Sequence, residues 1–307
     1  SSLLTGQYFW RTGRGAILQG AVWEDSIPSF PVILKENGYH IGYTYKVWYP
    51  GIPANAPYTN EEQYENRGRN FCFFSETIFK NDPDDQLIEI RKQELFDEVI
   101  GNFEDFLADR ENGQPFCYWW GPWNTHRPWV RGSGKKLWDI DPDDLIDILP
   151  PTLANVPEVR EDIADYLGEC VAFDHGLGLL IEKLKEIGEL DNTLIVVSGD
   201  HGMPFPRAKC NLYDQGTHVP LAVRFPPMIN TERIVDDFVN LTDLAPTFLE
   251  IAGIHVPEVM TGKSLIPILK AKGSGRINPE NNYVVTGFER HVASARAGRT
   301  PYPHRAI

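Results

Sequence analysis

Apolar residues recur along the chain with two different periods, one typical of helices and one of buried strands. Residues 160–187 place apolar side chains near a period of 3.6 residues and are followed by Gly188, so they predict a long amphipathic helix. The run LIVVS at 194–198 is too short for a buried helix and predicts a central strand covered on both faces. Further helices are predicted at 27–37, 86–110 and 243–252, and further strands at 116–120 and 220–225.

The order of these elements predicts an α/β fold class with a layered, mostly parallel central sheet, because strands alternate with helices. No internal repeat and no low-complexity linker divides the sequence. We expect one boundary after residue 255, with an α/β domain at 1–255 and the start of a smaller C-terminal region at 256–307. Both ends of the sequence resemble cuts through a longer protein, so we expect the first region to be truncated at its N-terminus and the second at its C-terminus.

The composition excludes several classes of partner. A chain of 307 residues with 42% hydrophobic and 23% charged residues is typical of a globular protein. The formal net charge of −14 argues against nucleic acid and anionic membranes, because both attract basic surfaces. No apolar run approaches the roughly 20 residues of a membrane span. The four cysteines form no CxxC pair, which argues against a zinc site and a dense disulfide framework.

Polar residues that can do chemistry follow three of the apolar segments. In open α/β sheets, ligands and catalytic groups gather at the carboxyl ends of the strands. If the three segments are neighbours in the sheet, their loops converge on one pocket. The loops contribute Lys46 from the first, His126 and Arg127 from the second, and Asp200, His201, Arg207 and Lys209 from the third.

Such a pocket could hold a divalent cation and a tetrahedral oxyanion together. Hard cations prefer oxygen ligands, which Asp200 supplies, while His201 is suited to be a nitrogen ligand or a donor to the ligand shell. Cations on the nonbridging oxygens of an anionic ester and a general acid at the leaving atom both lower the barrier to its hydrolysis. The residues therefore favour hydrolysis of an anionic ester.

Structural alternatives stand beside each of these assignments. Asp200 could be the capping residue of a turn, and Lys46 alone is typical of a solvated loop. His218 is expected on the substrate side or in a structural role, and not as a metal ligand. The basic run ERHVASARAGR at 289–299 forms either a rim of the cleft or an exposed loop. The tryptophans near His126 form either a packed aromatic wall or a sugar-binding face; they are Trp119, Trp120, Trp123 and Trp129.

Several motifs, in order, resemble the sulfatase family of the alkaline phosphatase superfamily. The opening SSLLTGQYFWRTG is similar to the segment after the signature whose first residue is oxidised to formylglycine. IGYTYKVWYPG, WNTHRP and LDNTLIVVSGDHG resemble, in turn, a lysine-bearing loop, the loop of the leaving-group histidine and the second metal-binding segment. DHGMPFPRAK followed by NLY is most similar to the heparan N-sulfatase, or sulfamidase-like, branch.

The resemblance implies a fold, a reaction and a set of roles. It implies an alkaline-phosphatase-like sandwich that hydrolyses sulfate esters or sulfamates on a sulfated carbohydrate with formylglycine and one Ca²⁺. Lys46 and Lys209 would bind the sulfate oxygens, and His126 would protonate the leaving atom. Asp200 and His201 would be calcium ligands. The expected contacts to the rest of the substrate come from Arg127, Arg207 and His218.

Two features depart from the family pattern. Trp48 stands where many sulfatases have a histidine. The signature, with the first pair of Asp ligands, is expected upstream of Ser1, so the fragment alone should be inactive. The resemblance also implies a formylglycine-generating or equivalent maturation enzyme as a partner of the parent protein, and a periplasmic or secreted location.

Two other functions fit the same residues. One is a phosphate or phosphonate ester hydrolase of the same superfamily, and the other is a catalytically inactive relative that binds sulfated glycans. The residue five positions before Ser1 would distinguish them. Cys or Ser there permits formylglycine, Thr indicates phosphoryl chemistry, and any other residue indicates a binding protein.

Overall fold

The computed structural model describes residues 1–13, 22–48, 58, 62–288 and 304–307. It confirms the α/β class and every predicted helix and strand, with shifts of a few residues at their ends. The helices are α1 (Ser2–Thr5), α2 (Phe30–Glu36), α3 (Phe74–Ile78), α4 (Asp85–Ala108), α5 (Ser133–Trp138), α6 (Pro157–Glu186), α7 (Asp214–Thr217), α8 (Leu244–Ile251) and α9 (Ile266–Lys270). The strands are β1 (His40–Tyr45), β2 (Phe116–Gly121), β3 (Ile195–Ser198), β4 (Leu221–Arg224), β5 (Thr286–Phe288) and β6 (His304–Ala306).

The described strands pair in three two-stranded ladders. β1 and β2 are parallel, as predicted, and their last pair is Tyr45 with Gly121. β3 and β4 are antiparallel, which differs from the predicted parallel arrangement. A parallel connection requires a crossover that usually contains a helix, whereas the chain between β3 and β4 contains only the short α7. All four residues of β3 are half-buried, and this too differs from the prediction of a strand covered on both faces.

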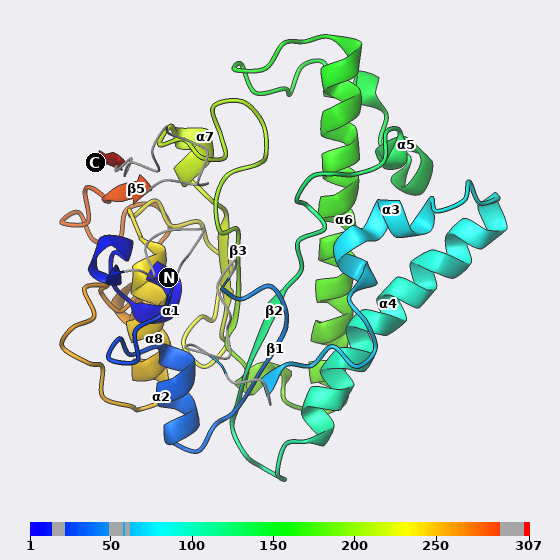
Figure 1. Ribbon diagram of the computed structural model, residues 1–307. Coiled ribbons are helices and arrows are strands. Elements are labelled where there is room, and N and C mark those ends of the chain that lie inside the picture. Colours follow the sequence, from blue (N-terminus) through cyan, green and yellow to red (C-terminus); the bar gives the residue numbers. More distant parts are fainter. Residues whose placement is uncertain (14–21, 49–57, 59–61, 289–303) are drawn as a thin grey trace.

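Helices cover the strands from two sides. In Figure 1, α4 and α6 lie on one side of β1 and β2, and α2 and α8 lie on the other. Ile41 and Tyr43 of β1 belong to the core cluster that contains Phe30 and Leu34 of α2. No described helix is both long enough and apolar enough to cross a membrane.

The chain beyond the predicted boundary at residue 255 packs onto the first residues of the sequence. Met260 belongs to the same core cluster as Leu4. The backbone amides of Thr261 and Gly262 both donate to the Gly6 carbonyl, at 2.8 and 2.9 Å. The division into 1–255 and 256–307 stays a prediction.

β1 ends in an unusual backbone conformation at Tyr45, which has a φ of 71°. This left-handed region is unfavourable for residues with a β-carbon, and a residue held there depends on its surroundings. Simple alternation would place the Tyr45 side chain on the α2 side, with Ile41 and Tyr43. Instead it is 4% exposed in the other core cluster, which contains Val99 and Phe103 of α4. The left-handed residue therefore turns the end of β1 toward α4.

Two carboxylates hold Tyr45 in place. The Tyr45 hydroxyl donates to Glu98 Oε1 at 2.9 Å, and the Tyr45 amide donates to Glu65 Oε1 at 2.9 Å. Glu98 is buried on α4 and also accepts hydrogen bonds from the amides of Asn70, at 2.8 Å, and Phe71, at 3.0 Å. Its carboxylate therefore joins α4, β1 and the segment before α3.

Replacement of Glu98 by alanine should destabilise the protein through this junction. The Tyr45 hydroxyl and the amides of Asn70 and Phe71 would lose their acceptor. We expect the free energy of unfolding to fall by at least about 2 kcal/mol, because each buried donor without a partner costs roughly 1–3 kcal/mol. Urea unfolding measures the change. Glu94→Ala, an exposed glutamate one turn earlier on α4, is the matched control, and equal stability of the two variants would contradict the assignment.

Candidate active site

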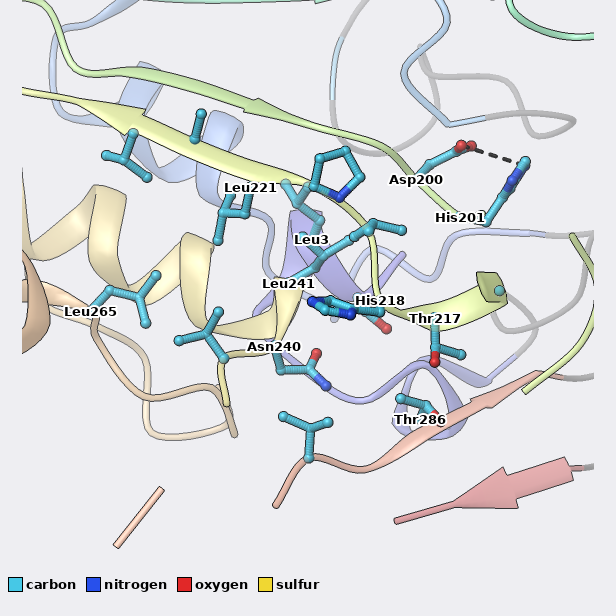
Figure 2. Close-up of a pocket in the computed structure, with 18 of the residues that line it drawn as sticks. Leu3, Asp200, His201, Thr217, His218, Leu221, Asn240, Leu241, Leu265 and Thr286 are labelled. Carbon is cyan, nitrogen blue, oxygen red and sulfur yellow. Dashed lines mark ion pairs between the residues drawn. The ribbon is translucent and has the colours of Figure 1, made fainter. Parts of the chain in front are cut away.

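The loops that follow β1, β2 and β3 open onto one cleft of about 2240 Å³. The structure thus brings together the three loops that the sequence predicted to converge. Figure 2 shows part of the cleft wall, with Asp200 and His201 at one end. The predicted site residues that line the cleft are Lys46, His126, Arg127, Asp200, His201, Lys209 and His218.

Asp200 is the centre of the charged end of the cleft. Lys46 Nζ donates to Asp200 Oδ2 at 2.5 Å, and His201 Nε2 lies 3.4 Å from Oδ1 (Figure 2). Burial raises the pKa of Asp200, but the attraction of Lys46, His201 and then Lys209 outweighs it, so the pKa is lowered. Asp200 therefore stays ionised, and its side chain remains 60% exposed to a ligand.

The end of the parallel ladder fixes the backbone of Lys46. The Lys46 amide donates to the Gly121 carbonyl at 2.9 Å, and Trp119 Nε1 donates to the Lys46 carbonyl at 3.0 Å. A β-carbon at position 121 would lie 1.9 Å from the Lys46 carbonyl oxygen, so only glycine permits this approach. With Tyr45 before it, Lys46 is directed across the cleft to Asp200.

Trp48 has a structural role in the same loop. Its side chain is buried and packs edge-on against Trp23, with ring centroids 5.3 Å apart. Its Nε1 donates to Ser1 Oγ at 3.1 Å. The indole thus anchors the Lys46 loop to the first residue of the sequence.

His126 lies in a tight turn at the cleft. Its amide donates to the Trp123 carbonyl at 2.8 Å, and its Nδ1 lies 2.6 Å from the Arg127 carbonyl. A carbonyl accepts, so this contact assigns the proton to Nδ1 and leaves Nε2 for the cleft. Desolvation lowers the pKa of His126, the Arg127 carbonyl raises it, and repulsion by Lys209, Lys46 and His201 lowers it further, so that the net shift is downward.

Lys209 shares this positive environment. Desolvation and then repulsion by Lys46 lower its pKa, against the opposing effects of Cys210 and Asp200. The loop that carries it is packed closely against α7. The Gly202 amide donates to the Gly216 carbonyl at 3.0 Å, and a β-carbon at position 202 would lie 1.8 Å from the Gln215 carbonyl oxygen. Crowded cations with lowered pKa values indicate a site that would gain stability from a bound anion.

Arg127 was predicted to contact substrate, but the structure shows its guanidinium already paired. It binds both carboxylate oxygens of Asp162 on α6, at 2.9 and 2.5 Å. It also lies over the rings of Trp129 and Phe205, at 4.4 and 4.8 Å, and donates to the Pro204 carbonyl at 3.2 Å. Arg127 therefore joins the His126 loop to the loop that follows Asp200.

The other two predicted substrate contacts differ in position. His218 lines the cleft, and its Nδ1 lies 3.6 Å from Asp214 Oδ1. Arg207 has a φ of 66° and is exposed, but it is not among the residues that line the cleft. The roles of both in substrate binding stay predictions. The basic run at 289–299 lies outside the described residues.

The sequence analysis missed Glu169, which lies on α6 and holds the His126 loop through Asn124. Glu169 is 2% exposed on α6 and accepts from the Ser75 amide and from Asn124 Nδ2, both at 3.2 Å. Asn124 Nδ2 also donates to the Glu169 carbonyl at 2.6 Å. Burial raises the pKa of Glu169 to about 7, although Ser75 and Asn124 partly offset it. An acidic residue on the apolar face of a predicted helix is the signal that could have revealed it.

The donors at Asp200 fit only part of a metal site. Asp200 supplies carboxylate oxygens and His201 a ring nitrogen, a pair suited to a hard cation only within a larger ligand set. Within residues 1–13, 22–48, 58, 62–288 and 304–307, no three His, Cys, Asp or Glu side chains are grouped to hold a metal ion. The ammonium of Lys46 at 2.5 Å already supplies one positive charge to this carboxylate.

The buried carboxyl of Glu169 should make stability depend on pH. Its folded pKa of about 7 lies above the ordinary value of 4.5, so the native state favours the protonated form. The stability that this preference contributes is complete at low pH and is lost as the pH rises through the window between these two values. Relative to Glu169→Gln, the wild type should lose unfolding free energy between pH 5 and 8, with a slope of at most about 1.4 kcal/mol per pH unit.

Urea unfolding at four pH values measures this difference. Glu158→Gln, at an exposed position in the first turn of the same helix, is the control and should follow the wild type at every pH. Parallel stability curves for wild type and Glu169→Gln would show that Glu169 is ionised in the folded protein.

Comparisons with known proteins show the family of the chain. A sulfatase family model matches residues 1–254. The N-sulphoglucosamine sulphohydrolase of Homo sapiens is 34% identical over 146 residues, which are 44% of this chain and 29% of that protein. The N-acetylglucosamine-6-O-sulfatase of Bacteroides thetaiotaomicron is 26% identical over 303 residues, which are 89% of this chain and 52% of that protein. The chain thus spans about half or less of the length of these curated relatives.

Solved structures show the same fold. A protein in complex with its substrate D-glucosamine-2-N,6-O-disulfate matches with a TM-score of 0.66 and 18% identity, over 99% of this chain and 76% of that one. The phosphonate monoester hydrolase of Silicibacter pomeroyi matches with a TM-score of 0.57 and 20% identity, over 94% and 69%. These matches confirm the predicted alkaline-phosphatase-like α/β fold. Since the family model covers most of the sequence, from residue 1 to residue 254, the chain belongs to the sulfatase family.

Proposed function

We propose that the protein hydrolyses sulfate esters or sulfamates on sulfated carbohydrates. The observation that supports this most directly is the meeting of Lys46, Lys209 and His126 around Asp200 in one cleft. Three separate loops contribute these groups. Two ammonium groups and an imidazole fit a tetrahedral dianion or monoanion with a leaving group to be protonated.

Each residue has a role that follows from its position. Lys46 and Lys209 bind the nonbridging sulfate oxygens and stabilise the charge that grows there in the transition state. His126 presents Nε2 to the leaving oxygen or nitrogen and donates a proton to it. The bound sulfate raises the pKa of His126, because its negative charge offsets the nearby cations, and so favours the protonated form that a general acid needs.

Two further components belong to the proposal. When bound at Asp200 and His201, Ca²⁺ would supply additional positive charge to the sulfate oxygens. The attacking group would be a formylglycine formed from a Cys or Ser upstream of Ser1, and Ser1 itself lines the same cleft. A maturation enzyme would generate it, and we propose a periplasmic or secreted location for the protein.

In the full-length protein, replacement of Lys209 by alanine should lower turnover of a sulfated sugar by roughly 100-fold or more, because a preorganised charge at the transition state is removed. Lys209→Arg should retain part of the activity. Lys185→Ala is the control, since Lys185 is exposed on α6 and paired with Glu182. Steady-state kinetics decides the matter: if Lys209→Ala and Lys185→Ala have the same kcat, Lys209 is a surface lysine.

The leaving-group role of His126 is tested with two substrates. In the full-length protein, His126→Ala should greatly reduce hydrolysis of a sulfated glucosamine and affect a nitrophenyl sulfate far less, because a stable phenolate departs without a proton. Equal losses on both substrates, together with a lowered melting temperature, would assign His126 to the aromatic wall.

The same assays separate the alternative functions. If the wild type cleaves a phosphonate monoester in preference to both sulfated substrates, the protein is a phosphonate hydrolase. If the full-length protein binds the sulfated sugar and cleaves none of the substrates, it is a binding protein.

A further inference from the structure

A second cluster of side chains lines the cleft beside the charged end. It consists of one basic residue, Arg69, and two aromatic residues, Phe73 and Trp123. The Arg69 guanidinium lies over the Trp123 ring, 4.7 Å from its centroid. Phe73 meets the same ring edge-on, with centroids 5.9 Å apart and planes at 89°. One basic and two aromatic side chains thus form one continuous surface.

This cluster is joined directly to the proposed general acid. Trp123 and His126 belong to the same turn, because the His126 amide donates to the Trp123 carbonyl at 2.8 Å. A sugar whose leaving atom lies at His126 would therefore place its neighbour in the chain near the Trp123 side of the cleft. The position suits the next residue of an oligosaccharide.

The cluster differs from the rest of the tryptophans near His126. Trp120 packs inside the molecule against Phe71 and Phe173, and Trp129 lies under Arg127. Trp119 and Trp123 both line the cleft. Trp119 Nε1 is bound to the Lys46 carbonyl at 3.0 Å, whereas Trp123 contacts the exposed side chains of Arg69 and Phe73. We therefore assign Trp120 and Trp129 to a packed aromatic wall and Trp123 to a sugar-binding face.

Arg69 is available to a ligand in a way that Arg127 is not. Its side chain is 53% exposed, and Glu65 is 3.7 Å away, a long distance for an ion pair. That distance is to Glu65 Oε2, while Oε1 of the same carboxylate accepts from the Tyr45 amide at 2.9 Å. Arg127, in contrast, has both carboxylate oxygens of Asp162 within 2.9 Å.

Phe73 presents a large apolar surface at the same place. Its side chain is 44% exposed, although Phe71 and Phe74 on either side of the same segment are buried. Exposed Glu76 lines the same wall and is suited to accept a hydrogen bond from a sugar hydroxyl. An exposed aromatic ring between a cation and a hydroxyl acceptor matches the apolar face, the charge and the hydroxyls of an acidic sugar.

We propose that Arg69, Phe73 and Trp123 form a subsite for the neighbouring sugar of an anionic oligosaccharide. The Arg69 guanidinium binds a sulfate or carboxylate group of that sugar in a charge-assisted, bidentate contact. Phe73 packs against the apolar face of its ring. The inference rests on the proposed function and narrows it: the substrate is an oligosaccharide with a second negative group next to the sulfated residue.

Calorimetric binding to four matched ligands tests the subsite. The ligands are a sulfated glucosamine alone and the same residue joined to a neutral sugar, to a sugar with a carboxylate, and to a sugar with a second sulfate. Arg69→Ala should weaken binding of an anionic disaccharide by about 10-fold or more, because charged hydrogen bonds are the strong ones, and leave the monosaccharide and the neutral disaccharide unchanged. Phe73→Ala should weaken all three disaccharides and spare the monosaccharide.

Controls exclude a loss of folding. Arg67→Ala removes a guanidinium two residues away that is bound to Asp105 at 2.7 and 3.0 Å and does not line the cleft. It should leave all four dissociation constants unchanged. Arg69→Lys should retain part of the preference for an anionic neighbour. Melting temperatures of all variants should match that of the wild type.

The outcomes separate the subsite from the reaction. If Arg69→Ala weakens all four ligands equally, or none of them, the subsite does not exist, whatever the turnover. If the full-length wild type shows the Arg69-dependent preference and hydrolyses no sulfate, the subsite is supported and the proposed hydrolysis fails. The anionic disaccharide whose binding Arg69→Ala weakens more identifies the recognised group as carboxylate or sulfate.

Discussion

The arrangement of the cleft depends on one backbone constraint, the left-handed conformation of Tyr45 at the end of β1. A tyrosine is held there because its ring is buried beside α4, its hydroxyl is bound by Glu98 and its amide by Glu65. These contacts offset the local strain, which is of order 1–3 kcal/mol. The next residue, Lys46, is thereby turned toward Asp200. Side chains on α4 thus help to determine the position of Lys46, the charged residue that follows β1.

The electrostatics of the cleft contrast with those of the whole molecule. The chain has a formal net charge of −14, yet the end of the cleft at Asp200 gathers Lys46, Lys209, His126 and His201. Because salt screens charges beyond about 10 Å, an anion in the cleft responds mainly to these nearby groups. Their crowding lowers the pKa of both His126 and Lys209. An anionic ligand would offset the mutual repulsion of Lys46, Lys209, His126 and His201.

Sequence periodicity predicted the long helices and the strands β2, β3 and β4, since these depend on local patterns; β1 was expected only as a short apolar segment. The sequence also predicted that Lys46, His126 and Asp200 would converge if the apolar segments before them were neighbours in the sheet. The antiparallel pairing of β3 with β4 was not predicted, since pairing direction depends on the path of the connecting chain. The apolar face of the predicted helix could have revealed that Glu169 is buried, but its partners Ser75 and Asn124 could not be predicted from a local pattern. The pairing of Arg127 with Asp162 on α6 depends on a long-range contact in the same way. For the same reason, the sequence left the tryptophans near His126 unresolved.

The contact between Arg127 and Asp162 has a consequence for how this site can vary over evolution. Arg127 belongs to the loop of His126, Asp162 to α6, and the guanidinium also covers Phe205 in the loop beyond Asp200. Loss of either charge would leave the other without its partner, and residues in one such network do not have independent effects. Substitutions at positions 127 and 162 should therefore be inherited as pairs, and a loop transplanted from a relative into this protein would need to bring its matching residue on α6 with it.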